Sequence, residues 1–223
     1  MSTQIRLSTE ALAVGYGGTV LIGDIALRVG AGRVLTLIGP NGSGKSTMLK
    51  IIAGVLEPTE GEVVVRGNIA PLIELGAGFD LELTARENIY LNGSLLGYTH
   101  EFIDQHLEDI IEFAELRDFM DMPLKNYSSG MVARIAFAIA TVTEPDVLIV
   151  DETLSVSDVF FQEKCERRIQ SFIDSGNVTV LFVSHSIDQV ERLCKSCVWI
   201  EKGKQRMVGP VEEVCKAYRN QFN

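Results

Sequence analysis

A chain of 223 residues with 46% hydrophobic and 22% charged residues can bury the core of one α/β domain and does not have the composition of a disordered protein. The net charge of −10 argues against a nucleic-acid partner, because such a partner would favour a basic surface. No apolar run reaches the roughly 18–20 residues that span a bilayer, and the N-terminus lacks the basic start and apolar core of a secretory signal. We therefore expect a cytosolic protein that can still dock to a membrane protein.

The N-terminal part is expected to form strands. Apolar residues alternate imperfectly with polar ones over Gln4–Leu7, Ala11–Val14 and Val20–Val29, and glycines interrupt the pattern. Tyr16 lies in one of the glycine clusters. An exposed aromatic ring upstream of a nucleotide site can stack on adenine, whereas a turn tyrosine can also pack on its own strand. Tyr16 is therefore a candidate adenine contact.

A phosphate-binding loop follows the apolar run Val34–Ile38, which is typical of a buried parallel strand. The loop fits the pattern G-x-x-x-x-G-K-[ST], and the helical pattern after it ends at Gly54. Its glycines let backbone N–H groups converge on an anion, Lys45 can reach the β- and γ-phosphates, and Ser46 can ligate Mg²⁺. A glycine-rich turn without a ligand is the alternative, and the flanking strand and helix argue against it. The candidate ATP-binding residues are Gly39, Pro40, Asn41, Gly42, Ser43, Gly44, Lys45, Ser46 and Thr47.

The middle of the chain changes from strand to helix. Gly61–Ile69 is expected to be a strand, and the glycines in Glu74–Asp80 favour a mobile or ligand-shaped loop. From Thr84 to about Arg117 the pattern is helical, and Thr84 with Glu87 predicts a capping box at its start. The apolar face of this helical insertion contains Ile103, Leu107, Ile110, Ile111 and Ala114.

In the second half, strands alternate with helices, which predicts a mostly parallel sheet that binds ligands at the carboxyl ends of its strands. The expected helices cover Val132–Thr141, residues 159–174, residues 187–195 and the C-terminus from Val211. The expected strands cover Asp146–Val150, Val178–Val183 and a hairpin over residues 197–208.

Two of these strands end in residues suited to ATP hydrolysis. Asp151 closes an apolar strand and can hold Mg²⁺, and Glu152 can polarise the attacking water. His185 follows the next strand and can contact the γ-phosphate. On their own, Asp151 and Glu152 would more often belong to a solvent-exposed turn, and a single histidine after a strand usually has no functional role. Together with the phosphate loop, they form a candidate catalytic group of Lys45, Glu152 and His185.

The four cysteines are Cys165, Cys194, Cys197 and Cys215. Cys194 and Cys197 form a single C-x-x-C, and a structural zinc site needs a second pair of ligands that this chain lacks. This pair also follows a helix rather than starting one, as a redox pair would. We expect semi-buried thiols, with a metal or redox role as the alternative.

Over nearly its whole length the chain is similar to the ATP-binding subunits of ABC transporters. The motifs that carry the resemblance occur in the order of that family. They are Tyr16 at the adenine-stacking position, Gly39–Thr47 as the phosphate loop, Tyr127–Met131 at the signature, Val147–Asp151 as the second phosphate-site strand, Glu152 as the catalytic glutamate, Ser155–Asp158 as the D-loop and His185 as the switch histidine.

Two motifs depart from the family pattern. The signature keeps Ser128 and Gly130, has Tyr127 for the leading leucine and Ser129 for the first glycine, and lacks the glutamine. The family's Q-loop glutamine is also missing, and Glu74 lies near the equivalent place as a weak candidate metal ligand.

These departures point to a subfamily. Glu74–Phe79, Arg86–Gly93 and Tyr127–Met131 resemble segments of exporters of lipid-linked polysaccharides such as O-antigen, capsule and teichoic acid. Some of those subunits carry a C-terminal carbohydrate-binding domain, and because this sequence ends at Asn223 we expect no such domain here.

The resemblance implies a P-loop NTPase fold in a single domain over residues 1–223. Residues 1–84 and 142–223 would form the RecA-like core with an N-terminal antiparallel β-subdomain, and residues about 85–141 would form a helical subdomain carrying the signature. Two chains would bind two ATP in a head-to-tail homodimer. Each site would combine the phosphate loop of one copy with Ser128, Ser129, Gly130 and Asp158 of the other.

The implied function is ATP hydrolysis that drives polysaccharide export at the cytoplasmic face of the inner membrane. Permease subunits would contact residues 74–98. The alternatives are an ABC ATPase for another substrate, a soluble ABC protein acting on ribosomes or DNA, and a weakly hydrolysing nucleotide-binding regulator. A protein that acts on ribosomes or DNA would be expected to have a basic surface and either a second ATPase half or a long insertion, and this chain has neither.

Overall fold

The computed structural model describes residues 4–16, 19–73, 75–151, 158–184 and 186–221. The chain divides into two compact units. Unit 1 contains Met1–Ile69, Pro145–Glu152 and Gln170–Asn223, and unit 2 contains Ala70–Glu144 and Thr153–Ile169. Within the described residues, no helix has both the length and the apolar character needed to cross a membrane.

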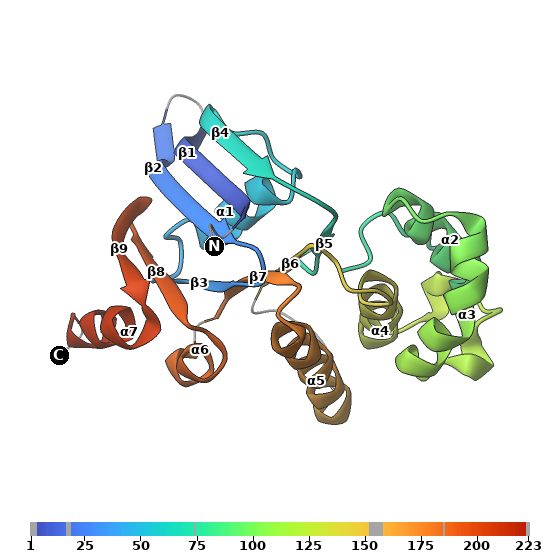
Figure 1. Ribbon diagram of the computed structural model, residues 1–223. Coiled ribbons are helices and arrows are strands. Elements are labelled where there is room, and N and C mark those ends of the chain that lie inside the picture. The colour runs from blue at the N-terminus through green and yellow to red at the C-terminus, as the bar shows by residue number, and fades with distance from the viewer. Residues whose placement is uncertain (1–3, 17–18, 74, 152–157, 185, 222–223) are drawn as a thin grey trace. The chain divides into compact units, whose positions relative to one another are not determined.

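An antiparallel sheet of order β2-β1-β4 forms one part of unit 1 (Figure 1). Its strands are β1 (Ile5–Tyr16), β2 (Thr19–Gly30) and β4 (Glu60–Val65). Inward-facing residues such as Leu7 and Leu27 are buried, which follows from the period-2 alternation of a strand with one face on a core. The expected N-terminal β-subdomain is confirmed.

The expected strands Gln4–Leu7 and Ala11–Val14 are wrong in one respect, because they belong to the single strand β1. The break between them is a bulge, at which Ala11 has a φ of 47° and the register shifts. Gly61 lies opposite the bulge, and a Cβ there would lie 2.4 Å from the Ala11 carbonyl oxygen. The bulge depends on this distant glycine, so the local pattern could not show it.

The second sheet of unit 1 runs in the order β6-β7-β3-β8-β9. Its first four strands are parallel and β9 is antiparallel to β8, which confirms the expected mostly parallel sheet. The strands are β3 (Val34–Ile38), β6 (Val147–Val150), β7 (Thr179–Val183), β8 (Ser196–Glu201) and β9 (Lys204–Pro210). Their near-continuous burial explains why β6 and β7 consist almost entirely of Val, Leu, Ile and Phe. The single strand expected over Gly61–Ile69 is wrong at its C-terminal end, because β4 ends at Val65 and a separate short strand, β5, covers Ile69–Pro71.

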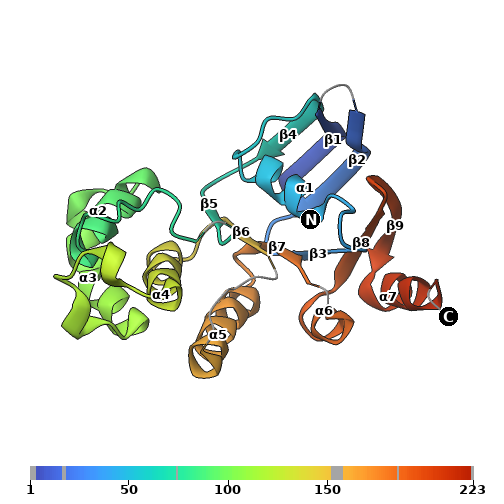
Figure 2. The same cartoon turned by 180° about the vertical axis from the view of Figure 1, so that it is seen from behind.

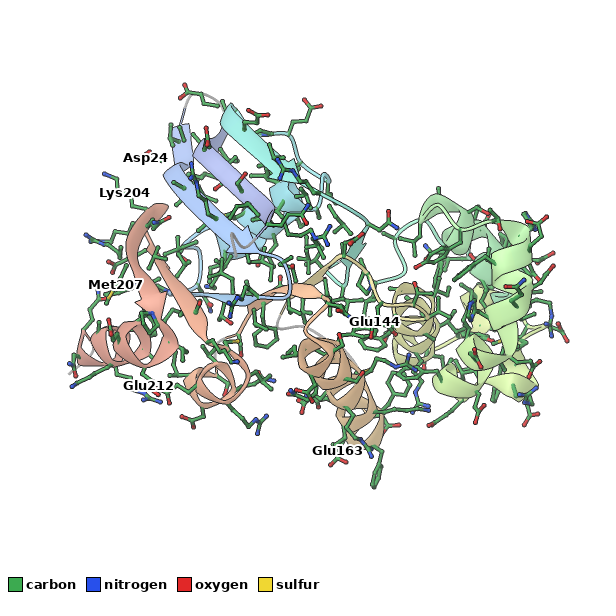
Figure 3. The ribbon with its side chains drawn as sticks, in the orientation of Figure 1. Asp24, Glu144, Glu163, Lys204, Met207 and Glu212 are labelled. Carbon is green, nitrogen blue, oxygen red and sulfur yellow. The ribbon has the colours of Figure 1, made fainter. Side chains whose placement is uncertain are left out.

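The helices of unit 1 follow the predicted order. They are α1 (Lys45–Ile52), the end of α5 (Val159–Ser175) from Gln170 on, α6 (Ile187–Leu193) and α7 (Val211–Asn220). Gly54, the expected stop of α1, has a φ of 75°, and its N–H donates to Ile51 O at 3.0 Å. Glu212 on α7 and Glu163 on α5 point outward, as charged residues of amphipathic helices do (Figure 3).

Unit 2 is helical apart from its connections (Figure 2). It contains α2 (Ala85–Leu95), α3 (His100–Ala114), the 3₁₀ turns η1 (Arg117–Phe119) and η2 (Leu124–Asn126), α4 (Ser129–Ala140) and the first part of α5 (Val159–Ser175). The capping box is confirmed, since the Glu87 N–H donates to Thr84 Oγ1 and the Glu87 carboxylate accepts from the Thr84 N–H. Four of the five residues expected on the apolar face of α3 are buried, and Leu107 is half-buried.

The cysteines lie deeper than expected, because all four are buried rather than semi-buried. Burial raises the pKa of Cys165 to about 12 and that of Cys194 to about 11, and it also raises the pKa of Cys197 and Cys215. High thiol pKa values leave little thiolate, so these side chains behave as small apolar residues. In the part of the chain that the structure describes, no group of three His, Cys, Asp or Glu residues is placed to hold a metal ion.

Candidate functional site

The phosphate loop connects β3 to α1 through backbone that favours glycine. Gly39, Gly42 and Gly44 have φ values of 152°, 74° and 98°. A Cβ on Gly39 would lie 1.9 Å from Ile200 O, and one on Gly44 would lie 2.4 Å from Ile22 Cγ1. Any larger side chain at these two positions would therefore force the loop open. The first N–H groups of α1 have no partner within the helix, so they can bind an anion at this turn.

Lys45, the first residue of α1, folds its side chain over the loop. Its Nζ donates to Gly39 O at 2.8 Å and to Pro40 O at 2.9 Å, and the residue is only 5% exposed. Burial lowers the pKa of the Lys45 ammonium, and the charge of Asp151 partly offsets this effect. A desolvated ammonium next to orphan N–H groups concentrates positive potential where phosphates would lie. Ser46 follows with an exposed side chain.

Asp151 reaches the same edge of the sheet as the phosphate loop. It follows β6 directly, and β7 lies between β6 and β3 in parallel register. Two strand spacings place the ends of β3 and β6 about 10 Å apart. That distance leaves room for a hydrated divalent cation between a serine hydroxyl and a carboxylate. Ser46 and Asp151 therefore fit the donor set that Mg²⁺ prefers.

Several predicted residues lie outside the described part of the chain. They are Glu74, Glu152, His185 and the D-loop residues Ser155, Val156 and Ser157. For Tyr16 only the backbone is described, at the end of β1.

The signature segment forms the start of α4 in unit 2. Ser128 is the N-cap, and its Oγ accepts the Met131 N–H at 3.2 Å. A hydroxyl that accepts through a lone pair still has its own O–H to donate. Ser128 and Ser129 are exposed and Gly130 is half-buried. The segment can therefore offer hydroxyl and N–H donors to an anion outside this unit.

Tyr127 anchors the approach to the signature. Its hydroxyl donates to Phe119 O at 2.6 Å, and its ring meets the Phe119 ring edge-on. Burial raises the pKa of Tyr127 to about 12, so the hydroxyl remains a donor at neutral pH. The tyrosine that replaces the family's leucine thus ties the signature to the η1 turn through a specific hydrogen bond.

Asp158 is held at the beginning of α5. One carboxylate oxygen accepts the Phe160 N–H at 2.9 Å, and the other pairs with the Arg134 guanidinium from α4. Arg134 was missed by the sequence reading. The available signal was that Arg134 is the one charged residue within α4, a helix otherwise made of small and apolar side chains.

Two asparagine side chains of α2 hold the preceding loop through hydrogen bonds. Asn88 is fully buried, and its Nδ2 donates to the carbonyls of Asp80, Leu83 and Thr84 while its Oδ1 accepts the Asp80 N–H. One turn later, Asn92 Nδ2 donates to Ala77 O at 2.9 Å. The irregular segment over residues 75–84 therefore has a defined shape against α2.

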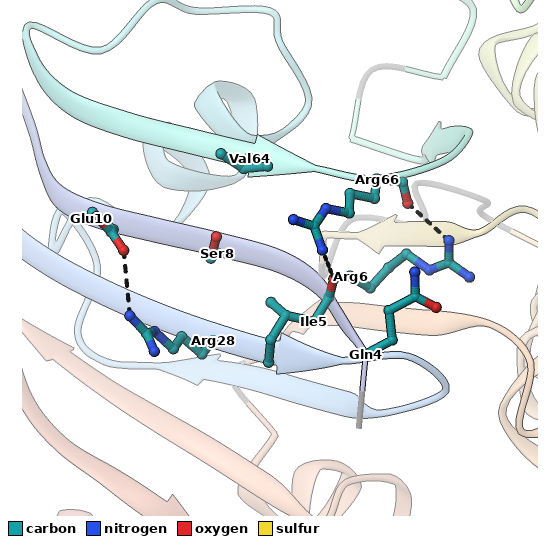
Figure 4. Close-up of a pocket in the computed structure, with 8 residues that line it drawn as sticks. All are labelled: Gln4, Ile5, Arg6, Ser8, Glu10, Arg28, Val64 and Arg66. Carbon is teal, nitrogen blue, oxygen red and sulfur yellow. Dashed lines mark hydrogen bonds and ion pairs between the residues drawn. The ribbon is translucent and has the colours of Figure 1, made fainter. Parts of the chain in front are cut away.

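A separate groove of about 290 Å³ lies on the outer face of the β2-β1-β4 sheet (Figure 4). Its arginines are already engaged: Arg28 pairs with Glu10, Arg66 donates to Ile5 O, and Arg6 donates to Arg66 O and pairs with Asp146 at 3.2 Å. None of the predicted site residues lines this groove. Its guanidinium groups serve to join strands rather than to complete the candidate site.

Comparison with known proteins points to one family. The family model described as ABC transporter matches residues 22–155. The O-antigen export system ATP-binding protein RfbB of Klebsiella pneumoniae is 48% identical over 198 residues, which cover 89% of this chain and 80% of that protein. The teichoic acids export ATP-binding protein TagH of Levilactobacillus brevis is 47% identical over 195 residues, which cover 87% of this chain and 54% of that protein.

Solved structures share the fold. An ATP-binding subunit of an ABC transporter matches with a TM-score of 0.82 and 24% identity, covering 96% of this chain and 93% of that one. A dimeric ATP-binding cassette in a post-hydrolysis state, bound to ADP and phosphate, matches with a TM-score of 0.75 and 22% identity, covering 92% and 98%.

Proposed function

Because this chain belongs to the ABC transporter family of ATP-binding proteins, we propose that it is the ATPase subunit of an export system for a lipid-linked polysaccharide. The observation that carries the substrate class is the 48% identity to an O-antigen export protein across 89% of the chain. The 47% identity to a teichoic acid export protein supports the same class, because both relatives are named for surface polymers.

The proposed hydrolytic half-site lies in unit 1. The phosphate loop and Lys45 bind the phosphates of ATP, while Ser46 and Asp151 hold Mg²⁺. Glu152 acts on the attacking water and His185 contacts the γ-phosphate, by resemblance to the family. The reaction is in-line attack of water on the γ-phosphate, with positive charge around the loop stabilising the transition state.

The other half-site comes from a second copy. Ser128 and the first N–H groups of α4 form a donor cradle that suits a γ-phosphate. A head-to-tail homodimer would bring this cradle onto the ATP held by the partner's phosphate loop. A cassette of the same fold forms a dimer with ADP and phosphate bound, which supports this arrangement.

The proposed contact with the permease lies along α2 and the loop before it, at the cytoplasmic face of the membrane. Leu95 is 64% exposed and Leu91 is 36% exposed, and they lie one turn apart on α2. A Cβ on Gly78 would lie 2.6 Å from Leu95 Cδ1, so the loop and these leucines form one continuous surface. Leu91, Leu95 and Gly78 are here named the leucine surface. Exposed apolar side chains on a rigid helix suit a protein partner.

The function can be tested in cells that lack this gene. Wild-type protein should restore the polysaccharide to the cell surface, and the Lys45→Ala variant should leave the lipid-linked polymer on the cytoplasmic side. Surface glycan is measured by labelling intact cells, and the total polymer is measured after lysis. Normal surface glycan in the deletion strain, with another transported compound lost, would show that the chain serves a different substrate.

Replacing Leu95 with glutamate should weaken capture of the membrane subunit at least about tenfold, because a charge would be buried at the interface. The measurement is co-purification of the membrane protein with the tagged chain. ATP binding and the melting temperature should not change, since Leu95 is exposed.

The matched control is Val55→Glu, which places the same charge at a 47% exposed apolar residue of unit 1. Equal loss of capture in both variants, or full capture by the Leu95→Glu variant, would contradict the leucine surface as the contact.

A further inference from the structure

Arg134 lies at the centre of an ion-pair cluster in unit 2. Its two terminal nitrogens reach different carboxylates: one pairs with Asp158 before α5, and the other pairs with Glu115 after α3 at 3.2 Å. The guanidinium carbon lies 4.6 Å above the centre of the Phe161 ring. Only 17% of the Arg134 side chain is exposed. Packing on one face and ion pairs at two edges leave this side chain a single arrangement.

The ring beneath Arg134 is itself fixed. Phe161 is 1% exposed and meets the rings of Phe113 and Phe137 edge-on. These rings come from α3, α4 and α5, so the stacking platform cannot shift unless the three helices move together.

Two further cationic side chains hold α5 against α3 and α4 further along the helix. Lys164 Nζ donates to Phe113 O at 2.9 Å, at the carboxyl end of α3, and Arg168 donates to Thr141 O at 3.1 Å, at the end of α4. Both cations also lie within 5 Å of the Phe113 ring centre, at 4.8 and 4.7 Å. These contacts orient the body of α5, whereas Arg134 binds Asp158, the residue just before α5.

Arg134 and Ser128 belong to the same rigid element. They are separated by six positions, so the rise of an α-helix places them about 9 Å apart along the axis of α4. Asp158 therefore takes its position from the helix whose first turn carries the signature. A residue held in this way moves only when that helix moves.

We propose that Arg134 is a positioning residue for the second half of the ATP site: it fixes Asp158 relative to Ser128, so that both meet the nucleotide of a second copy as one unit. This inference rests on the proposed function, because a second copy must supply the nucleotide. Its role is geometric and involves no bond to ATP. Misplacement of a site residue by about 1 Å can cost two orders of magnitude in rate, so the ion pair matters well beyond its small contribution to folding.

Arg134→Met should lower the turnover number at saturating ATP about tenfold and leave the dissociation constant of ATP for the monomer unchanged within about twofold. Methionine keeps an apolar stem over Phe161 and removes the charge. Arg134→Lys keeps the charge and should recover part of the turnover, although one ammonium cannot bridge both carboxylates as the guanidinium does. Equal turnover of the Met and Lys variants would show that packing alone explains the residue.

The partner variants separate the two ion pairs. Asp158→Asn keeps a cap for α5 and loses the charge, so it should match Arg134→Met, and the double variant should be no worse than either single one. Glu115→Gln removes the opposite pair together with the pair that Glu115 forms with Lys164 at 2.8 Å, and it should keep turnover within about twofold of wild type. Additive losses in the double variant, or a loss in Glu115→Gln as large as in Asp158→Asn, would overturn the assignment.

A readout without ATP distinguishes failure of this inference from failure of the proposed function. Amide hydrogen exchange at Phe160 and Phe161 should rise at least about fivefold in Arg134→Met, because the Asp158 carboxylate that accepts these N–H groups loses its anchor. Unchanged exchange rejects the positioning role, whether or not the chain hydrolyses ATP. If exchange rises in Arg134→Met but the wild-type protein does not hydrolyse ATP, the proposed function is rejected, and with it the role of Arg134 toward a second copy.

Discussion

Replacement of Lys45 by alanine should reduce ATP turnover at least about 100-fold, the effect of removing one preorganised charge from a developing transition state. The Lys45 ammonium lies over the phosphate loop, held by the carbonyls of Gly39 and Pro40. Phosphates that enter the loop would take over these donors and place the charge on the β- and γ-phosphate oxygens. Without the lysine, the loop keeps only its backbone N–H groups.

The Lys45→Ala variant should fold normally. Burial lowers the pKa of this ammonium, so the charged form is disfavoured in the folded state relative to the unfolded chain. Removing the side chain should therefore leave the melting temperature within about 3 °C of wild type. Release of phosphate from ATP and thermal unfolding are the two measurements.

Two variants accompany this experiment. Lys45→Arg should be nearly as inactive as the alanine variant, since a planar guanidinium does not fit a position that is 5% exposed and shaped for a compact ammonium. Lys204→Ala changes an exposed lysine of β9 and should keep full turnover. Turnover by Lys45→Ala above one tenth of the wild-type rate would contradict the assignment of the loop as the ATP site.

The parts of the fold that follow local rules could be predicted from the sequence. The phosphate loop is a contiguous pattern, and its flanking strand Val34–Ile38 and helix stop at Gly54 agree with the structure. The capping box of Thr84 and Glu87 is likewise a relation across three positions. In both cases the chemistry that stabilises the turn lies within a few residues, so a reading of neighbours is sufficient.

The parts that depend on distant residues could not be predicted. The bulge in β1 is accommodated by Gly61, which faces it from β4. Arg134 finds its partners in Glu115 and Asp158, which lie 19 and 24 positions away with no periodic relation to it. Tyr127 looked like a departure from the signature, yet its hydrogen bond to Phe119 gives it a structural task. Such tasks become visible only when separate helices are brought together.

The replacement Glu152→Gln should lower phosphate release at least about 100-fold while ATP binding is retained, because a neutral amide cannot accept a proton from the attacking water. Glu152 follows Asp151 in the sequence and is not one of the proposed metal ligands, so the change leaves those ligands in place. ATP that is bound and not hydrolysed should then hold two chains of 24.5 kDa together. Size-exclusion chromatography with light scattering, with and without ATP and Mg²⁺, measures the dimer.

The matched control for this change is Glu163→Gln, the same substitution at an exposed residue of α5 that points outward (Figure 3). It should hydrolyse ATP as wild type does and form no lasting dimer. Equally slow phosphate release by wild type and by the Glu152→Gln variant would favour a weakly hydrolysing nucleotide-binding regulator, because Glu152 would then have no role in turnover.

The head-to-tail arrangement can be tested by mixing two variant chains that each keep one half of the site intact. Ser128→Arg in the Glu152→Gln background should abolish the dimer, since a bulky side chain would occupy the donor cradle at the start of α4. Lys45→Ala in the same background should also abolish it. Mixing these two chains should restore a dimer that retains one nucleotide, because the intact phosphate loop of the first chain then meets the intact signature of the second. If the mixture stays monomeric while the parent Glu152→Gln chain dimerises, the two halves of the site do not come from different copies.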